Sequence, residues 1–258
     1  MKSIGTLEIG SLVTFHDLDF DTVSETKGFE TTRGAIGYLW RVANHNHFRE
    51  GTTILVAEHA FINSVYFTNI AGRAYLTSSI RKTLITELDK LSASFRSFLV
   101  PIPVGGQNTG NIIYDYISIF TADEINASAP TSALDYDTLS MGTIPNLMNS
   151  IRPISTDNEV FLRNRPGTMW TRSGGDEGAY YVQTSGTPML VNSSSTASVK
   201  YQPIRPYVII DSSAPISAQK YYNVWLFAGA HPEPVGYFKQ NGEWAPFFAK
   251  SAIKGGTV

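Results

Sequence analysis

Hydrophobic and polar residues alternate over short stretches along most of the chain, with one longer stretch of helical spacing. Between residues 78 and 91 isoleucine and leucine recur every three or four positions, and Ser78 or Ser79 can cap the first free amides. This spacing predicts a helix. Thr121, with Glu124 three residues later, has the form of a capping box, which predicts a second, short helix just after Thr121.

The shorter periodic stretches predict strands, so the expected fold class is α+β and mostly β. A polar stretch with a glycine, residues 44–53, predicts the turn of one hairpin, and Asn241-Gly242 predicts the tight turn of another. Residues 127–160 are rich in turn residues, which is typical of an insertion or a functional segment. Strands are expected at residues 5–15, 38–43, 54–57, 117–120, 167–172, 179–184, 187–191, 207–211, 221–227, 235–239 and 243–248.

Two parts of the chain differ in character, a body at residues 1–215 and a β-extension at residues 216–258. The extension is dense in aromatic residues, and a β-unit of this size is marginal by itself. Exposed rings would form an apolar patch of the kind that marks an interface. We therefore expect a chain ending near Ala218 to stay folded but to lose self-assembly. The alternative is that these rings complete the main core. The expected assembly residues are Trp225, Tyr237, Trp244 and Phe247.

Composition narrows the range of partners. Charged residues make up 16% of the chain, against roughly 25% in typical soluble domains. The net charge is −2 and the basic residues are scattered, so no nucleic-acid partner is expected. Without cysteine there are no disulfides, thiolate metal sites or cysteine nucleophiles. The sequence has neither the apolar stretch of a signal peptide nor a run long enough to span a membrane, so we expect synthesis in the cytoplasm and no membrane insertion.

Two histidines form the main candidate for a metal site. His45 and His47 stand two residues apart, so on a strand both would lie on one side and could bind one metal. Glu58 and His59 are the nearest further ligands, across the predicted hairpin. Two donors do not complete a tetrahedral site, and the alternative is a polar turn with solvated histidines. We therefore expect no metal and no cofactor.

The sequence contains few of the motifs that indicate an enzyme. No nucleophile elbow and no phosphate-binding glycine loop occurs, so no catalytic residue is expected. Paired carboxylates remain a route to glycoside hydrolysis, because the separation of such a pair is spatial rather than sequential. The alternative for these carboxylates is solvated loop and cap positions. They are Asp115, Asp123, Glu124, Asp135 and Asp137.

One arginine lies in unusually apolar surroundings. Arg205 stands between Pro203 and Pro206 at the start of an apolar strand, and its charge cannot be buried without a partner. We expect an ion pair in the core that locks loops together. A ligand-binding arginine is the alternative.

Arg205 also belongs to a set of motifs that carries a resemblance. Residues 170–173 (Trp-Thr-Arg-Ser), 179–186 and 204–210 resemble the end of a bacterial and phage domain family of unknown function. That family ends in a Trp-Leu-Arg-Ser stretch, a strand with a turn, and a Val-Arg-Pro-Ala-like strand. Shorter matches at residues 9–13, 40–42, 79–84 and 117–124 extend the resemblance over residues 5–212, with large insertions. The expected structural motif consists of Trp40, Trp170, Arg172 and Arg205.

The family is similar to the C-type-lectin-like fold of formylglycine-generating-enzyme relatives. The resemblance implies small twisted sheets, one or two helices and long ordered loops. The enzymes' copper site needs two cysteines, and this chain has none. The calcium-lectin signature is also missing, since Glu233-Pro234 is followed by Val235 rather than asparagine. Neither the enzyme activity nor calcium binding is therefore carried over.

The C-terminal segment carries a second resemblance. Residues 236–244, Gly-Tyr-Phe-Lys-Gln-Asn-Gly-Glu-Trp, resemble a hairpin repeated at the ends of many phage tail and head-decoration proteins. This implies a structural or accessory protein of a bacteriophage virion, in the tail, the baseplate or the capsid surface. The implied partners are other virion proteins and further copies of the chain, and exposed Tyr and Trp offer contacts to host-surface glycan. Two alternatives stay open, a glycan-processing enzyme and a bacterial surface binding module.

Overall fold

The computed structural model describes the elements that make up the fold together with their immediate connections. The described residues are 2–14, 23–24, 28–29, 39–58, 62–65, 75–89, 93–106, 110–125, 139–145, 147, 168–175, 178–183, 189–192, 202–218, 220, 224–227, 236–240 and 243–247.

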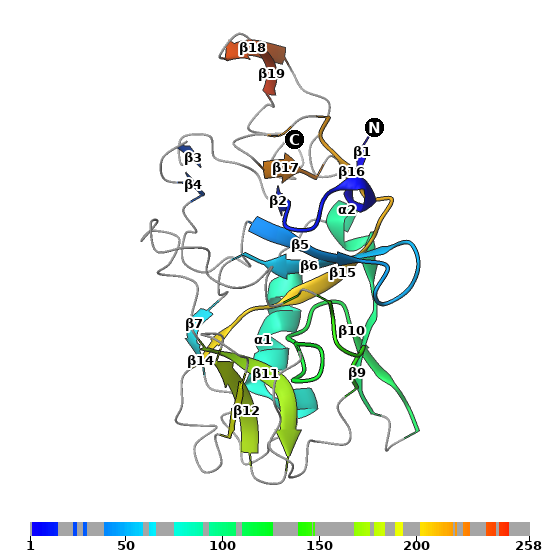
Figure 1. Ribbon diagram of the computed structural model, residues 1–258, viewed down its shortest axis with the longest axis vertical. Coiled ribbons are helices and arrows are strands. Elements are labelled where there is room, and N and C mark those ends of the chain that lie inside the picture. Colours follow the sequence, from blue (N-terminus) through cyan, green and yellow to red (C-terminus); the bar gives the residue numbers. More distant parts are fainter. Residues whose placement is uncertain are drawn as a thin grey trace.

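A six-stranded sheet forms the centre of the molecule, in the order β17-β2-β5-β6-β15-β8 (Figure 1). Neighbouring strands are antiparallel, except that β17 runs parallel to β2. The hairpin expected around residues 44–53 is confirmed as β5 and β6. The strands are β2 (Leu12–Thr14), β5 (Leu39–His45), β6 (Thr52–Ala57), β8 (Leu99–Val100), β15 (Tyr207–Asp211) and β17 (Val224–Leu226).

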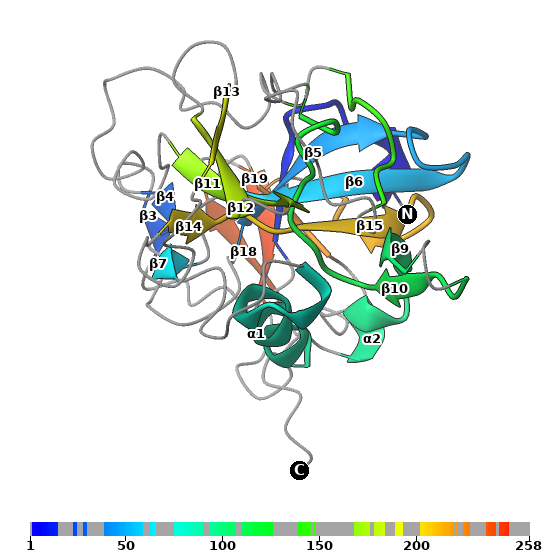
Figure 2. The same ribbon diagram turned by 90° about the horizontal axis from the view of Figure 1, so that it is seen from below.

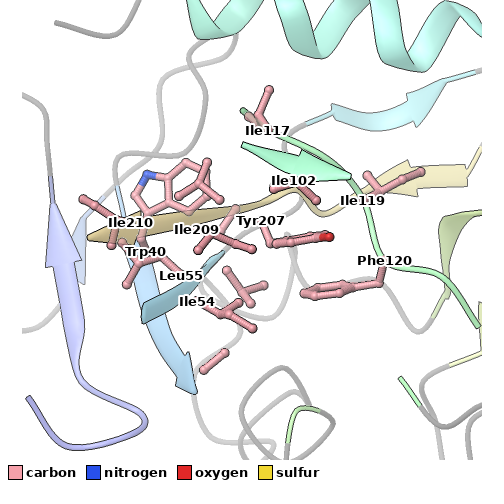
Figure 3. Close-up of a cluster of buried hydrophobic side chains, with 14 of the residues drawn as sticks. Trp40, Ile54, Leu55, Ile102, Ile117, Ile119, Phe120, Tyr207, Ile209 and Ile210 are labelled. Carbon is pink, nitrogen blue, oxygen red and sulfur yellow. The ribbon is translucent and has the colours of Figure 1, made fainter. Parts of the chain in front are cut away.

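The middle strands of this sheet are covered on both faces. All six residues of β6 are buried, and so are the first four of β15. A continuous apolar run is the sequence pattern of a strand buried on both sides, as against one that alternates between core and solvent. Their side chains and those of neighbouring segments form the core shown in Figure 3, where Phe120 stacks on Tyr207 with ring centroids 4.4 Å apart. The core labelled there includes Trp40, Ile54, Leu55, Ile102, Ile117, Ile119, Phe120, Tyr207, Ile209 and Ile210.

Smaller sheets surround the centre. In Figure 1 the β11-β12-β13 sheet lies at the lower end of the molecule, and the β18–β19 hairpin lies at the upper end. The hairpin predicted from Asn241-Gly242 is confirmed, because Gln240 and Glu243 are register partners. The described pairs and the triple are β1 (Lys2–Ser3) with β16 (Pro215–Ile216), β3 (Val23–Ser24) with β4 (Gly28–Phe29), β7 (Ile62–Val65) with β14 (Gln202–Ile204), β9 (Ile102–Gly105) with β10 (Ile113–Asp115), β11 (Thr168–Gly175) with β12 (Gly178–Gln183) and β13 (Met189–Asn192), and β18 (Gly236–Gln240) with β19 (Glu243–Phe247).

Helix α1 (Ser79–Leu88) confirms the helix predicted from spacing. The Ser78 hydroxyl accepts a hydrogen bond from the Arg81 amide, as an N-cap residue does. Ile80, Leu84 and Leu88 are buried on one face. The single-turn helix α2 (Ala93–Arg96) follows, and Figure 2 shows both helices on the same side of β15. None of the helices in the described part of the chain has the length and apolar character needed to cross a membrane.

The capping box at Thr121 forms, but it does not start a helix within the described residues. The Thr121 amide donates to Glu124 Oε2 at 2.9 Å, and the Glu124 amide donates to Thr121 Oγ1 at 3.1 Å. Residues 122–125 nevertheless form a turn, and the Glu124 carbonyl accepts from the Ile144 amide. A tertiary hydrogen bond thus takes the carbonyl that a helix would have used. The α+β, mostly β class is confirmed, with α1 as the only long helix in the described residues.

Two expected strands are shorter than predicted. Of residues 117–120, only Ser118 bridges to another segment, through Tyr207. The rest of that segment bonds to a side chain and amide of β11 instead, as described below. Within the predicted range 5–15, the 3₁₀ turn Ile4–Thr6 takes the first residues, and of the described residues only Leu12–Thr14 form a strand. In both segments, contacts with residues distant in sequence decide the backbone geometry. The spacing of apolar residues along the chain does not reveal such contacts.

Strand β17, which lies within the expected extension at residues 216–258, pairs with the central sheet. Val224, Trp225 and Leu226 pair with Leu12, Val13 and Thr14 of β2. Phe227 is completely buried, with ring centroids 5.8 Å from Phe95 and 5.7 Å from Phe98. Because these rings fill the core, the extension that stands apart from the central sheet is the β18–β19 hairpin.

Candidate functional site

Arg172 on β11 is the centre of a buried polar cluster. Its guanidinium donates to Glu124 Oε1 at 2.5 Å, and neither side chain is exposed to solvent. The same group donates to the carbonyls of Ile119 and Leu139 and to the Tyr207 hydroxyl. One side chain therefore ties β11 and β15 to the segments around residues 119–124 and 139.

Electrostatics keep this cluster in one charge state. Burial alone would lower the pKa of Arg172, but Glu124 and the nearby tyrosines outweigh it and raise that pKa. Burial raises the pKa of Tyr207 and of Tyr75 far above the usual range. Ser118 Oγ links Tyr75 to Arg172, because it donates to the Tyr75 hydroxyl and accepts from Arg172, while Arg172 itself donates to the Tyr207 hydroxyl. Both phenols thus stay neutral and Arg172 stays charged at any ordinary pH.

Both carboxylate oxygens of Glu124 are occupied. Oε1 accepts from Arg172 and from the Met141 amide at 3.1 Å, and Oε2 accepts from the Thr121 amide. The Ala122 amide, close to Thr121 in the chain, donates to Ser173 Oγ on β11, 51 residues away in sequence. Because every one of these atoms has a partner inside the protein, the arrangement is suited to holding segments together rather than to exchanging a proton with a substrate.

Arg205 lies in a second buried cluster. Its Nε donates to the Ala57 carbonyl at 2.7 Å, and its Nη2 donates to the Glu58 carbonyl at 3.0 Å and lies 3.8 Å from Glu58 Oε2. Only 4% of Arg205 and 1% of Glu58 is exposed, so the charges are held away from water. This arginine joins the end of β6 to the segment that enters β15.

Sequence reasoning missed Arg41 as the main partner of Glu58. Arg41 on β5 makes a two-pronged contact, with Nε and Nη2 each 2.6 Å from a carboxylate oxygen. Its Nη1 donates to the Gly10 carbonyl, and burial lowers its pKa. A signal was present, because β5 and β6 were predicted as a hairpin and Glu58 directly follows β6. Glu58, a candidate metal ligand on sequence alone, lies between the two arginines.

The two histidines do not converge on a common point. His45 ends β5, and its ring nitrogens lie 2.9 Å from Thr53 Oγ1 and 2.8 Å from the Leu7 carbonyl. Asn46 turns the chain with φ 59°, and His47 Nε2 bonds to the carbonyls of Met141 and Gly142. The strand geometry assumed for this pair thus ends at His45. Within the residues described, no group of three possible metal-binding side chains occurs. His59 lies outside them.

Each candidate carboxylate that the structure describes has a partner of its own. Asp115 is buried and bound by Arg81 through two contacts of 2.8 Å, which raise the pKa of that arginine. Asp123 accepts from Ser140 Oγ at 2.6 Å. Asp135 and Asp137 lie outside the described residues. The structure therefore places Asp115 and Glu124 in separate ion pairs.

The expected tryptophans lie mostly in the core. Trp40 and Trp170 are buried, and Trp170 packs edge-on against Tyr181 at 5.9 Å. Trp225 is 8% exposed, with the ammonium groups of Lys2 and Lys220 over its ring at 4.6 and 5.6 Å. The other expected assembly residues, Tyr237, Trp244 and Phe247, lie in β18 and β19, and their side chains are outside the description.

An exposed apolar row runs along and beyond β10, and sequence reasoning missed it. Ile112, Tyr114 and Tyr116 are 50%, 54% and 46% exposed. The alternate residues turn inward, with Ile113 half-buried and Asp115 and Ile117 buried. The sequence offered no clear signal for this row, because residues 112–117 are apolar or aromatic at every position except Asp115, and Asp115 is the residue that points inward. Large apolar side chains are thus available for contact on this face.

Comparison of the chain with protein-family models, with curated proteins and with solved structures finds no match. The site is therefore defined by its geometry alone, as two buried ion-pair clusters that lock segments together and one exposed apolar row.

Proposed function

We propose that this protein is a non-enzymatic structural or accessory subunit of a bacteriophage particle. The proposal rests mainly on where the charged side chains of the protein lie. The arginines and carboxylates of both clusters are engaged with one another, and all of them are buried except Arg41, which is half-buried, while the exposed row offers isoleucine and tyrosine. Such a surface suits contact with a partner molecule. The phage context rests on the sequence resemblances.

The proposed fold of the body is C-type-lectin-like. Small sheets around a central one, one long helix and segments fastened by buried ion pairs support it. The clusters at Arg172 and Arg205 would then serve as the fasteners of long loops. An experimental structure with a strand order foreign to that fold would overturn this part of the proposal.

Mass spectrometry of purified phage particles tests the proposed location. Particles induced from a host that carries the gene should contain the chain in amounts comparable with known virion proteins after gradient purification. A parallel preparation from a host with the gene deleted is the control. If the chain stays in the soluble fraction while intact particles lack it, the proposal is wrong.

Host-surface glycan is the partner that the exposed row supports within this proposal. Tyrosine rings with a polar tip are suited to stacking on sugars. Tyr114→Ala and Tyr116→Ala should weaken binding to host cell-wall polysaccharide, whereas Ile85→Ala, which changes an exposed residue on α1, should not. If all three variants bind the polysaccharide equally well, the exposed apolar row is not the glycan-binding surface. A turnover of the polysaccharide that one carboxylate-to-amide change abolishes would favour the glycan-processing alternative.

A further inference from the structure

The two edges of the β18–β19 hairpin are chemically different. The register runs from Gly236↔Phe247 at the open end to Gln240↔Glu243 at the closed end, so two residues connect the strands. In a hairpin with a two-residue connection, the flanking residues form a hydrogen-bonded pair, and bonded and non-bonded pairs then alternate along the ladder. The Lys239↔Trp244 and Tyr237↔Pro246 pairs are therefore non-bonded pairs. Their backbone amides and carbonyls face the outer edges of the hairpin.

The outer edge of β19 is closed to a further strand. Pro246 has no amide hydrogen, and it occupies a position whose amide would face outward. An incoming strand would leave one of its carbonyls without a partner there. The outer edge of β18 contains no proline, and both Tyr237 and Lys239 offer an amide and a carbonyl. Among the described strands, only β19 pairs with β18.

We propose that β18 pairs antiparallel with β18 of a second copy of this chain, about a two-fold axis at Phe238. Tyr237 then lies opposite Lys239 of the partner subunit, and the two residues exchange both backbone hydrogen bonds. The symmetry repeats the same pair on the other side of the axis. The result is a four-stranded sheet in the order β19-β18-β18-β19.

Charge favours this register between two copies over the neighbouring one. If the two-fold axis passed through Lys239 instead of Phe238, Lys239 would lie directly opposite Lys239 of the partner subunit. Like charges directly opposite one another are destabilising. Centring the pairing on Phe238 places each lysine opposite a tyrosine. Because Pro246 closes both outer strands, the assembly ends at two copies and does not grow into a fibre.

This pairing does not depend on the proposed phage function, so it can be tested on the full-length purified chain. Five-residue strands bury little surface, which makes the dimer weak. Covalent trapping is therefore the appropriate measurement. The chain contains no cysteine, so a single introduced cysteine reports on one position alone.

Phe238→Cys should form an intermolecular disulfide. Across the proposed axis the two copies of residue 238 form a non-bonded pair with Cα atoms about 4.5 Å apart, which a disulfide can bridge. Gln240→Cys is the matched control, since residue 240 lies on the same strand and face but about 13 Å from its own copy. After mild oxidation we expect at least about tenfold more disulfide dimer for Phe238→Cys than for Gln240→Cys on non-reducing gels, since only the former lies within bridging range.

Tyr237→Pro in the Phe238→Cys background tests the backbone contact directly. It removes an outward amide, as Pro246 does on β19, without removing a bond within the hairpin. The dimer yield should fall to the level of the Gln240→Cys control, with an unchanged circular dichroism spectrum. Equal trapping at residues 238 and 240 would overturn the register and the proposal. Trapping at residue 238 that survives Tyr237→Pro would overturn the role of the β18 edge.

Discussion

Arg172 and Glu124 form an ion pair from which water is completely excluded, with Arg172 Nη2 at 2.5 Å from Glu124 Oε1. They stand 48 residues apart in sequence. Such a pair contributes little net stability compared with apolar residues of similar volume, but the removal of one partner leaves a buried charge. The pair thus makes the docking of β11 on the segment at 119–124 highly specific.

Arg172→Met should lower the free energy of unfolding by about 3–5 kcal/mol, because Glu124 would remain buried without its cation. Urea denaturation measures this loss. The control is Arg96→Ala, since the Arg96–Asp89 pair at 3.2 Å is 40% and 72% exposed. An exposed pair should contribute under about 1 kcal/mol. Similar losses in both variants would contradict the buried role of Arg172.

Arg205→Ala should lower the free energy of unfolding by about 3 kcal/mol, because the carbonyls of Ala57 and Glu58 would lose their charged donor. Glu58 keeps Arg41 as a partner, so the loss should be smaller than for Arg172→Met. Arg205→Lys should recover only part of it, since lysine lacks the guanidinium fork. Thermal melts compare the stabilities of Arg205→Ala, Arg205→Lys and Arg172→Met with that of the wild type. An unchanged midpoint together with lost ligand binding would favour the ligand-binding alternative.

Phe227→Ala should lower the free energy of unfolding by about 3–5 kcal/mol, because a buried ring between Phe95 and Phe98 would become a cavity. Tyr116→Ala, at an exposed ring, should change it by about 0.5 kcal/mol or less.

Truncation tests the same region on a larger scale. A chain that ends near Ala218 lacks β17, so we now expect it to lose cooperative unfolding, whereas a chain that ends after Ala230 should keep it. If the shorter chain melts like the full-length protein, β17 is not part of the body and the boundary near residue 215 stands.

Asp211 should make stability depend on acidity. Hydrogen bonds from the Ser213 hydroxyl and amide lower the pKa of Asp211 below its ordinary value of 3.8. A lowered pKa adds stability above the unfolded-state value, and this contribution is lost as the pH falls through the folded-state value. Asp211→Ala should therefore be less stable than wild type at neutral pH, and the difference should disappear in strong acid. Urea denaturation at both pH values measures it, and a difference that persists in acid would contradict this cause.

Local sequence signals determined several elements of this protein. The spacing of Ile80, Leu84 and Leu88, with Ser78 as cap, specifies α1, because an α-helix places such residues on one face. Glycine-containing turns between apolar runs specify the β5–β6 and β18–β19 hairpins. Each of these signals spans only a few residues, and each specifies a helix or a hairpin formed by those residues and their close neighbours in the chain.

Tertiary structure alone decided the partners. Several contacts join segments that are distant in sequence. They are the parallel pairing of β17 with β2, the hydrogen bond from the Ile144 amide to the Glu124 carbonyl, and the ion pairs of Glu58 with Arg41 and Arg205. An apolar strand or a buried arginine shows in its sequence that it needs a partner, but many segments could satisfy that need. Packing of the whole core selects one of them, because the buried arginines and carboxylates must meet while the apolar strands of the central sheet are covered.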